Sequence, residues 1–264
     1  MLNCDSVGNS RATIAVPVRS KNGMLRSDPV HPIAADGQLA EALVTAVIEA
    51  PILPTVYPTE VETLCRYADV LHDEGYPALE ILARPLDQAL TVMREIARRP
   101  QRNKIRWGIG TMRTAADASA ALELQPDFLV SPAFSRRVLQ VTAQSGMPYI
   151  PAVHTFQDVQ NVLDAFDELG LTVRLLKLCP VFGLTRQYVT SLCGCFPGIV
   201  FCPTGEVELD NYLHWKKIPG IVAPMGSGFV PRLWLENGDW PAVRARLRQI
   251  RSLAETAALS LASQ

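Results

Sequence analysis

A lysine, Lys177, lies inside an apolar run at 175–178 that has the length of a buried strand and is followed closely by Pro180. Burial of a charged amine is costly, so the fold must either pair Lys177 or keep it partly neutral. A neutral amine is a nucleophile that forms an imine with a carbonyl carbon. The alternative is a lysine that extends its amine to solvent from the end of a core strand. Only Lys177 lies in an apolar run; the other lysines are Lys21, Lys104, Lys216 and Lys217.

The other candidate residues lie in predicted strands or directly after them. Glu80 is a carboxylate inside the apolar segment 78–82, and Arg84 follows that segment. The alternatives are an outward-facing, solvated Glu80 and an Arg84 that pairs on the surface or begins the next helix. Thr111 comes after two glycines and is either a ligand-binding residue or a turn residue. The remaining candidates fit either ligand binding or ordinary turns: Pro132, Thr204, Gly205, Gly226 and Ser227.

These residues need a scaffold that brings strand ends together. Short apolar segments alternate with amphipathic ones, which predicts strands followed by helices. The predicted strands are 52–57, 78–82, 105–108, 128–130, 149–152, 173–178, 199–201 and 221–223. The predicted helices are 60–72, 87–98, 114–122, 135–144, 155–169, 185–195 and 209–216, with Thr59, Ser135 and Thr155 as candidate caps. The pattern predicts an α/β fold, a (β/α)₈ TIM barrel, with a doubly wound open sheet as the rival.

The two ends of the chain differ from this repeat. Residues 1–37 are rich in Ser, Asn, Gly and Pro, and we predict an N-terminal extension with an extended stretch at 12–18. The barrel domain is predicted at 38–264, with a helix at 38–50 leading into it. Apolar positions recur at helical spacing in 240–261, which predicts a C-terminal helix packed outside the strands.

Composition narrows the partners. The formal net charge of −1 gives no basic field for nucleic acid, and no segment has the length and hydrophobicity of a membrane span. The six cysteines include no CxxC pair, so reduced thiols and a cytoplasmic location are expected. His154 and His214 lie at no metal-ligand spacing with carboxylates, which favours a structural or surface role for both and no metal.

Six motifs together resemble the family of 2-keto-3-deoxy-6-phosphogluconate (KDPG) aldolase and 4-hydroxy-2-oxoglutarate (KHG) aldolase. The resemblance covers roughly residues 51–231 in family order. Phe-Cys-Pro-Thr-Gly at 201–205 is the most distinctive motif. The others are Leu-Glu-Ile-Leu-Ala-Arg at 79–84, Gly-Ile-Gly-Thr at 108–111, Ser-Pro at 131–132, Ile-Pro at 150–151 and Leu-Lys-Leu-Cys-Pro at 176–180.

The resemblance implies a class I aldolase on a (β/α)₈ barrel. Such an enzyme reversibly splits a 2-keto-4-hydroxy acid into pyruvate and an aldehyde, without a metal or organic cofactor. Lys177 would be the Schiff-base lysine and Glu80 the proton shuttle, while Arg84 and Thr111 would hold the substrate carboxylate. The resemblance also implies a small-molecule partner, a 2-keto acid or pyruvate, and a homotrimer.

The sequence departs from the family pattern around the aldehyde half of the substrate. Glu206 and Met225 stand where the phosphorylated-sugar members have glycines, and a carboxylate repels a dianion. Cys179 replaces an aromatic residue, and Ala152 and His154 replace small ones. A non-phosphorylated acid, such as 4-hydroxy-2-oxoglutarate or a deoxy sugar acid, is therefore an alternative substrate. Two rival classes are a metal-dependent pyruvate aldolase and a non-catalytic barrel that binds sugar acids.

Overall fold

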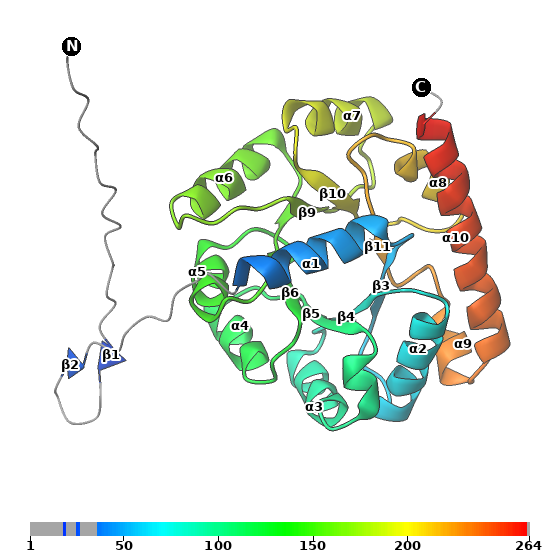
Figure 1. Cartoon of the computed structure of the whole chain (residues 1–264), viewed down its shortest axis with the longest axis horizontal. Coiled ribbons are helices and arrows are strands. Elements are labelled where there is room, and N and C mark those ends of the chain that lie inside the picture. The colour runs from blue at the N-terminus through cyan, green and yellow to red at the C-terminus, as the bar shows by residue number, and fades with distance from the viewer. Residues whose placement is uncertain (1–17, 20–24, 27–35, 263–264) are drawn as a thin grey trace, which may run out of the picture. The chain divides into compact units, whose positions relative to one another are not determined.

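The computed structural model describes residues 18–19, 25–26 and 36–262. The chain divides into two units, 1–35 and 36–264. In the first unit, β1 (Val18–Arg19) pairs antiparallel with β2 (Leu25–Arg26). The predicted extended stretch at 12–18 falls outside the described residues except for Val18. The second unit carries the repeated strands and helices (Figure 1).

The second unit is an α/β fold whose strands all pair in parallel. One sheet has the order β11-β3-β4-β5-β6-β7 and the other β10-β9-β8. Isolated parallel bridges join Phe201 to Ile221 and Thr204 to Met225. The strands are β3 (Leu53–Val56), β4 (Ala78–Leu82), β5 (Arg106–Gly110), β6 (Phe128–Val130), β7 (Tyr149–Ile150), β8 (Ala152–Val153), β9 (Leu175–Leu178), β10 (Val200–Pro203) and β11 (Met225–Gly226).

Four predicted strands differ from the observed ones only in their ends, and two others differ more, each at a proline. The predicted strand 149–152 is divided into β7 and β8 by Pro151, which has no N–H to donate to a neighbouring strand. The prediction of a strand at 221–223 was wrong: Ile221 forms only an isolated bridge, and β11 begins at Met225, directly after Pro224. The carbonyl of Pro224 still accepts a hydrogen bond from the N–H of Leu53 (3.0 Å).

The predicted helices are all present, with shifted ends. They are α1 (Asp36–Glu49), α2 (Val61–Asp73), α3 (Leu86–Ile96), α4 (Ala115–Leu122), α5 (Arg136–Ser145), α6 (Phe156–Asp167), α7 (Arg186–Cys195), α8 (Tyr212–Lys216) and α10 (Trp240–Ala262). Ser135 and Thr155 are caps, whereas the expected cap Thr59 is not, since α2 begins after Glu60. The 3₁₀ turn η2 (Pro100–Asn103) and α9 (Arg232–Glu236) were not predicted.

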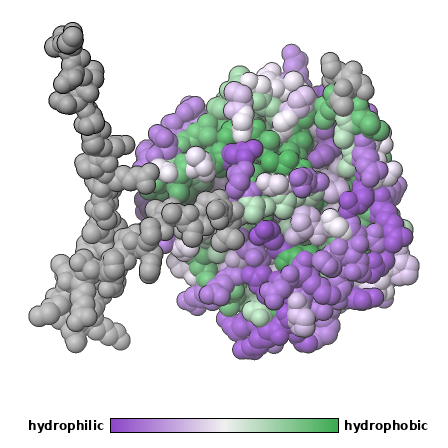
Figure 2. All heavy atoms as spheres, viewed as in Figure 1, coloured by the Kyte–Doolittle hydropathy of each residue, from purple (hydrophilic) through white to green (hydrophobic). Residues whose placement is uncertain are grey.

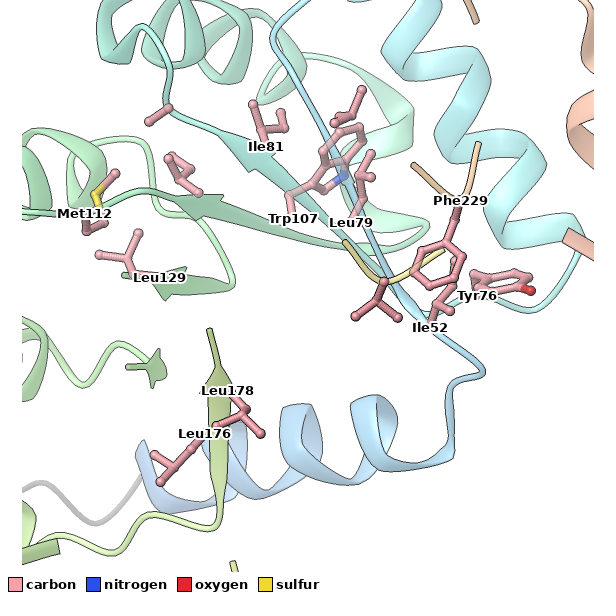
Figure 3. Packing of buried hydrophobic residues seen from close by; sticks show 14 of the residues in the cluster. Ile52, Tyr76, Leu79, Ile81, Trp107, Met112, Leu129, Leu176, Leu178 and Phe229 are labelled. Atoms are coloured by element: carbon pink, nitrogen blue, oxygen red, sulfur yellow. The ribbon is translucent and has the colours of Figure 1, made fainter. Parts of the chain in front are cut away.

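The largest hydrophobic cluster lies between strands and helices. Leu79 and Ile81 of β4, Trp107 of β5, and Leu176 and Leu178 of β9 belong to it (Figure 3). These residues alternate along their strands, and side chains at alternate positions of a strand point to opposite faces. Glu80 and Lys177, which lie between them in sequence, therefore point to the other side of the sheet.

A second cluster occupies that other side and is covered by α1. Leu43 and Val47 of α1 pack with Ala78 of β4, Phe128 of β6 and Leu175 of β9, each of which begins its strand. Helix α1 therefore covers the amino ends of the strands, and Figure 1 shows it lying across them. Glu80 and Lys177 lie two residues further along their strands than Ala78 and Leu175, towards the carboxyl ends.

The C-terminal helix α10 packs on the outside of the repeat, as predicted. Val243, Leu247 and Ile250 are fully buried, and the hydroxyl of Tyr76 donates to the carbonyl of Leu247 (2.7 Å). Arg248 pairs with Glu74 at the end of α2 (2.9 Å). Hydrophilic surface predominates where α2, α9 and α10 lie, at the lower right of Figure 2. None of the helices formed by the described residues has the length and apolar content to cross a membrane.

Candidate active site

Lys177 and Glu80 are each the third residue of a parallel strand, β9 and β4 respectively. Lys177 pairs with Ala152 and Cys202, while Glu80 pairs with Thr55. The Lys177 side chain is 8% exposed and the Glu80 side chain is fully buried. Nζ of Lys177 lies 3.8 Å from Oε1 of Glu80, which is within ion-pair range and longer than a hydrogen bond. The structure thus brings the two predicted catalytic residues together.

Two glycines of β5 make space for neighbouring side chains, Gly110 for Glu80 and Gly108 for Phe128. A Cβ built on Gly110 would collide with Oε1 of Glu80, and one built on Gly108 would collide with the ring of Phe128. Glu80 lies beside Gly108 in the register, and Leu82 lies beside Gly110. A side chain at position 110 would therefore displace the carboxylate from its place near Lys177.

The Glu80 carboxylate lies in an unusual electrostatic environment. Neither of its oxygens has a hydrogen-bond partner. Burial raises the pKa of Glu80 above its usual range, and the positive charges of Lys177 and Arg84 partly oppose that rise. A carboxyl group with a raised pKa takes up and releases protons closer to neutral pH than an exposed one. Both of its oxygens therefore retain the capacity to accept a hydrogen bond.

Arg84 and Thr111 follow adjacent strands. The exposed guanidinium of Arg84 lies over the ring of Tyr57, with its Cζ 5.4 Å from the ring centroid. Thr111 has a φ of 68°, a left-handed conformation that is rare for a β-branched residue. Backbone strain of this kind tends to be found at functional sites. Because β4 ends at Leu82 and β5 ends at Gly110, both residues lie at the carboxyl ends of their strands, and the charge of Arg84 acts on Glu80.

Pro132 lines a cavity of about 210 Å³ together with Ala152, His154 and Cys179. Its neighbour Ser131 is fully buried, and its hydroxyl lies 2.6 Å from the Tyr149 hydroxyl. The Ser131 hydroxyl therefore has a hydrogen-bond partner within the fold, and Ser131 anchors the segment that leads to Pro132. Cys179 lies close enough to the site that the charges of Lys177, Glu80 and Arg84 act on its thiol.

The loops after β10 and β11 hold the other candidates. Oγ1 of Thr204 is buried without a hydrogen-bond partner, and Gly205 has a φ of 99°, which favours glycine. Gly226 and Ser227 line a second, smaller cavity that also includes Thr55. Three of the predicted site residues thus line a cavity, Pro132 the larger one and Gly226 and Ser227 the smaller one, and Lys177 and Glu80 are in the lining of neither of these two.

Sequence reasoning missed three residues of this region. Gly110 was part of a predicted motif but was given no role. Its closeness to the Glu80 carboxylate is visible only in the folded structure. Tyr57 ends a predicted strand, but its contact with Arg84 crosses between strands. Nδ1 of His154 is buried without a partner beside the cavity that Cys179 lines, a position that its spacing in the sequence does not reveal. Within the described residues, no group of three or more His, Cys, Asp or Glu side chains could hold a metal.

The fold and these side chains define a class: parallel α/β proteins with a buried amine and carboxylate towards the carboxyl ends of their strands. The sequence profile of the KDPG and KHG aldolase family matches residues 43–246. The chain belongs to this family.

Individual relatives agree with the family assignment. The 2-dehydro-3-deoxy-phosphogluconate aldolase of Pseudomonas aeruginosa is 29% identical over 203 residues, which cover 76% of this chain and 88% of that protein. The KHG/KDPG aldolase of Escherichia coli is 24% identical over 210 residues, covering 80% and 93%. The structure of a 4-hydroxy-2-oxoglutarate/2-dehydro-3-deoxyphosphogluconate aldolase from TTHB1 superposes with a TM-score of 0.69 at 29% identity, covering 80% of this chain and 98% of that one.

Proposed function

We propose that the protein is a class I aldolase that reversibly cleaves a 2-keto-4-hydroxy acid of the KDPG type into pyruvate and an aldehyde. The observation that carries this proposal is the buried pair of Lys177 and Glu80, with Nζ and Oε1 3.8 Å apart. The relatives' names support the substrate type, because they refer to aldolases of KDPG or KHG. The reaction makes it a lyase of carbon–carbon bonds.

The proposed chemistry begins at Lys177. Its neutral amine adds to the C2 carbonyl of the substrate, and loss of water from the carbinolamine gives a protonated imine. As the C4 hydroxyl loses its proton, the C3–C4 bond breaks, the aldehyde leaves, and the bonding electrons pass to the imine nitrogen to give an enamine. Protonation at C3 and hydrolysis of the imine release pyruvate and restore the amine.

Glu80 is the proposed proton shuttle of this sequence. Its carboxylate accepts the C4 hydroxyl proton directly or through water, and it returns a proton at C3. Neither carboxylate oxygen accepts a hydrogen bond from the protein, so both remain able to take up these protons. The pKa of Glu80, which burial raises, suits both the acceptance of a proton from the C4 hydroxyl and the return of a proton to C3.

The remaining candidates bind the substrate in this proposal. Arg84 and Thr111 hold the carboxylate of the keto acid, since a planar guanidinium matches a carboxylate. Pro132 shapes the wall beside Lys177, and the hydroxyl of Thr204 donates a hydrogen bond to the substrate. Gly205, Gly226 and Ser227 line the end of the site that receives the far end of the aldehyde half.

We also propose that residues 38–264 form one closed (β/α)₈ barrel with a C-terminal helix, preceded by an extension at 1–37. Two observations support closure: only Pro151 separates β7 from β8, and Thr204 bridges to Met225 between the other edges of the two sheets.

A homotrimer in the cytoplasm is proposed from the family resemblance. The described cysteines are free thiols, as a reducing compartment requires. Light scattering of the purified chain tests the trimer.

Reduction with borohydride in the presence of pyruvate tests the mechanism. We expect one reduced pyruvyl adduct, mapped to Lys177 by mass spectrometry and absent from Lys177→Met. Lys216 of α8 provides a matched control, because burial lowers its pKa and thereby favours its neutral, reactive amine. Lys216→Met should keep the adduct. Folded protein without an adduct, or an adduct that persists in Lys177→Met, would contradict the proposal.

A further inference from the structure

The loops after β10 and β11 pack against each other beyond the ends of these strands. A Cβ built on Gly226 would lie 3.2 Å from the carbonyl oxygen of Val207. The N–H of Val181 donates to the carbonyl of Thr204 (2.9 Å), so the loop after β10 also adjoins the end of β9. These contacts place residues 205–208 next to Gly226 and directly beyond the strand that carries Lys177.

A carboxylate side chain lies against the loop after β11. A Cβ built on Gly228 would lie 3.2 Å from Oε1 and 3.3 Å from Cγ of Glu208. The Glu208 carboxylate therefore lies against the backbone of the residue that follows Ser227. Glycine backbone amides at such a position favour an approaching anion, but here a negatively charged group is already next to them.

A second carboxylate is held in the same loop. Glu206 has a φ of 56°, a left-handed conformation directly after Gly205. The Asn211 side chain fixes the loop: its amide donates to the carbonyl of Glu206 (2.6 Å), and its oxygen accepts from the N–H of Glu208 (2.9 Å). The backbone that carries both carboxylates is thus held by a specific local structure.

The charges in this region are not balanced. Within the described residues, neither Glu206 nor Glu208 takes part in an ion pair. The guanidinium that lines the cavity with Gly226 and Ser227 belongs to Arg232, and it is paired with Glu236 (2.5 Å). The loops after β10 and β11 therefore carry two carboxylates that no ion pair among the described residues neutralises.

We propose that Glu206 and Glu208 are specificity-determining residues that exclude a terminal phosphate, so that the aldehyde half of the substrate is an uncharged hydroxyaldehyde. A phosphate dianion brought near two unpaired carboxylates is repelled, and more strongly so where water is partly excluded. A hydroxyl group can instead donate a hydrogen bond to either carboxylate. This inference rests on the proposed aldolase function and names its substrate class.

The test compares substrates that differ only in the phosphate. Cleavage of 2-keto-3-deoxygluconate and of its 6-phosphate is measured. The C4 epimers of these two acids are measured in the same way. We expect kcat/KM to be at least about tenfold higher for the phosphate-free acid, because unpaired carboxylates repel the dianion. Higher ionic strength should narrow the difference, because salt screens exposed charges.

Charge-neutral variants then assign the effect to residues. Glu208→Gln and Glu206→Gln should each raise kcat/KM for the phosphorylated acid several-fold, with Glu208→Gln also reducing the salt dependence. Glu255→Gln is the matched control, because it removes an exposed carboxylate from α10, outside the strands. A control with the same effect as Glu208→Gln would show that only net charge matters and would overturn the assignment.

The outcomes separate this inference from the proposed function. Pyruvate trapping at Lys177 depends on no part of the aldehyde half. If trapping succeeds and the phosphorylated acid is the better substrate, the inference is wrong and the aldolase proposal stands. If trapping fails in folded protein, or no acid of either configuration is cleaved, the aldolase proposal fails and the inference falls with it.

Discussion

The two parts of the candidate site differ in how their charges are held. Around Lys177 and Glu80 the charged atoms are buried and lie 3.8 Å apart, with apolar residues on the same strands. Around Glu206 and Glu208 the carboxylates are exposed and belong to a loop fixed by one asparagine. The comparison suggests that strand register sets the chemistry of this protein, while loop residues select its substrate. Changes in the first part should affect all substrates equally, and changes in the second should alter their ratio.

The largest effect is expected for Lys177→Met. Without an amine no imine forms, so we expect kcat to fall at least about a thousandfold for phosphorylated and phosphate-free acids alike, as when a covalent nucleophile is removed. Steady-state kinetics with both acids measure this loss. A loss confined to one acid would contradict the division between chemistry and selection.

Glu80→Gln should have the next largest effect. Loss of a general acid–base group lowers kcat by about a hundredfold to ten thousandfold. Because burial raises the pKa of Glu80 above its ordinary value of 4.5, the reactive carboxylate is lost as pH falls through that raised pKa. The wild-type rate should therefore decline on the acid side at a pH above 4.5, and the variant should lack this decline. A pH profile unchanged by the substitution would assign the titration to another group.

Gly110→Ala tests the space that Glu80 requires. The new Cβ would displace the carboxylate, and displacement of a catalytic group by about 1 Å can cost about a hundredfold in rate. Overpacking should also lower the free energy of unfolding by about 1–3 kcal/mol. Gly194→Ala in α7 is the matched control, since a Cβ there meets nothing within 4 Å. Kinetics and urea unfolding of both variants measure the two effects, and equal activity would rule out steric control of Glu80.

The smallest effect is expected for Tyr57→Leu. An exposed contact between a cation and an aromatic ring contributes about 0.5–1 kcal/mol, so KM for the keto acid should rise about two- to fivefold. The value of kcat should hardly change, because Arg84 binds the carboxylate and takes no part in proton transfer. Tyr57→Phe retains the aromatic ring and should behave like wild type. A fall in kcat rather than a rise in KM would place Tyr57 in the chemistry itself.

Sequence reasoning worked well where the signal was local. Apolar segments located most strands. Lys177 was identified as a candidate because it is a lysine inside such a segment. Sequence reasoning was less accurate at Pro224, because an apolar run at 221–223 resembles a strand although pairing with β3 begins only at Met225. Glu80 is far from Lys177 in the sequence, so their proximity was expected only if the predicted strands close into a barrel, as the family resemblance also implied.

Contacts between strands account for most of what was missed. The role of Gly110 depends on the side chain of Glu80, and that of Tyr57 depends on Arg84. Neither residue type nor periodicity along one strand contains this information. The position of Glu208 against Gly228 likewise depends on how two loops meet after β10 and β11.

The helix α1 has a consequence for the order of events in the proposed reaction. Its residues Leu43 and Val47 pack with Phe128 and Leu175, so apolar side chains cover the amino ends of the strands, on the side away from the candidate site. The water lost when the imine forms, and the water needed to hydrolyse it, must then use the same opening as the substrate. In the proposed reaction the C3–C4 bond breaks before the imine is hydrolysed, so the aldehyde is free to leave before that water is needed. We therefore expect ordered release, with the aldehyde first and pyruvate second.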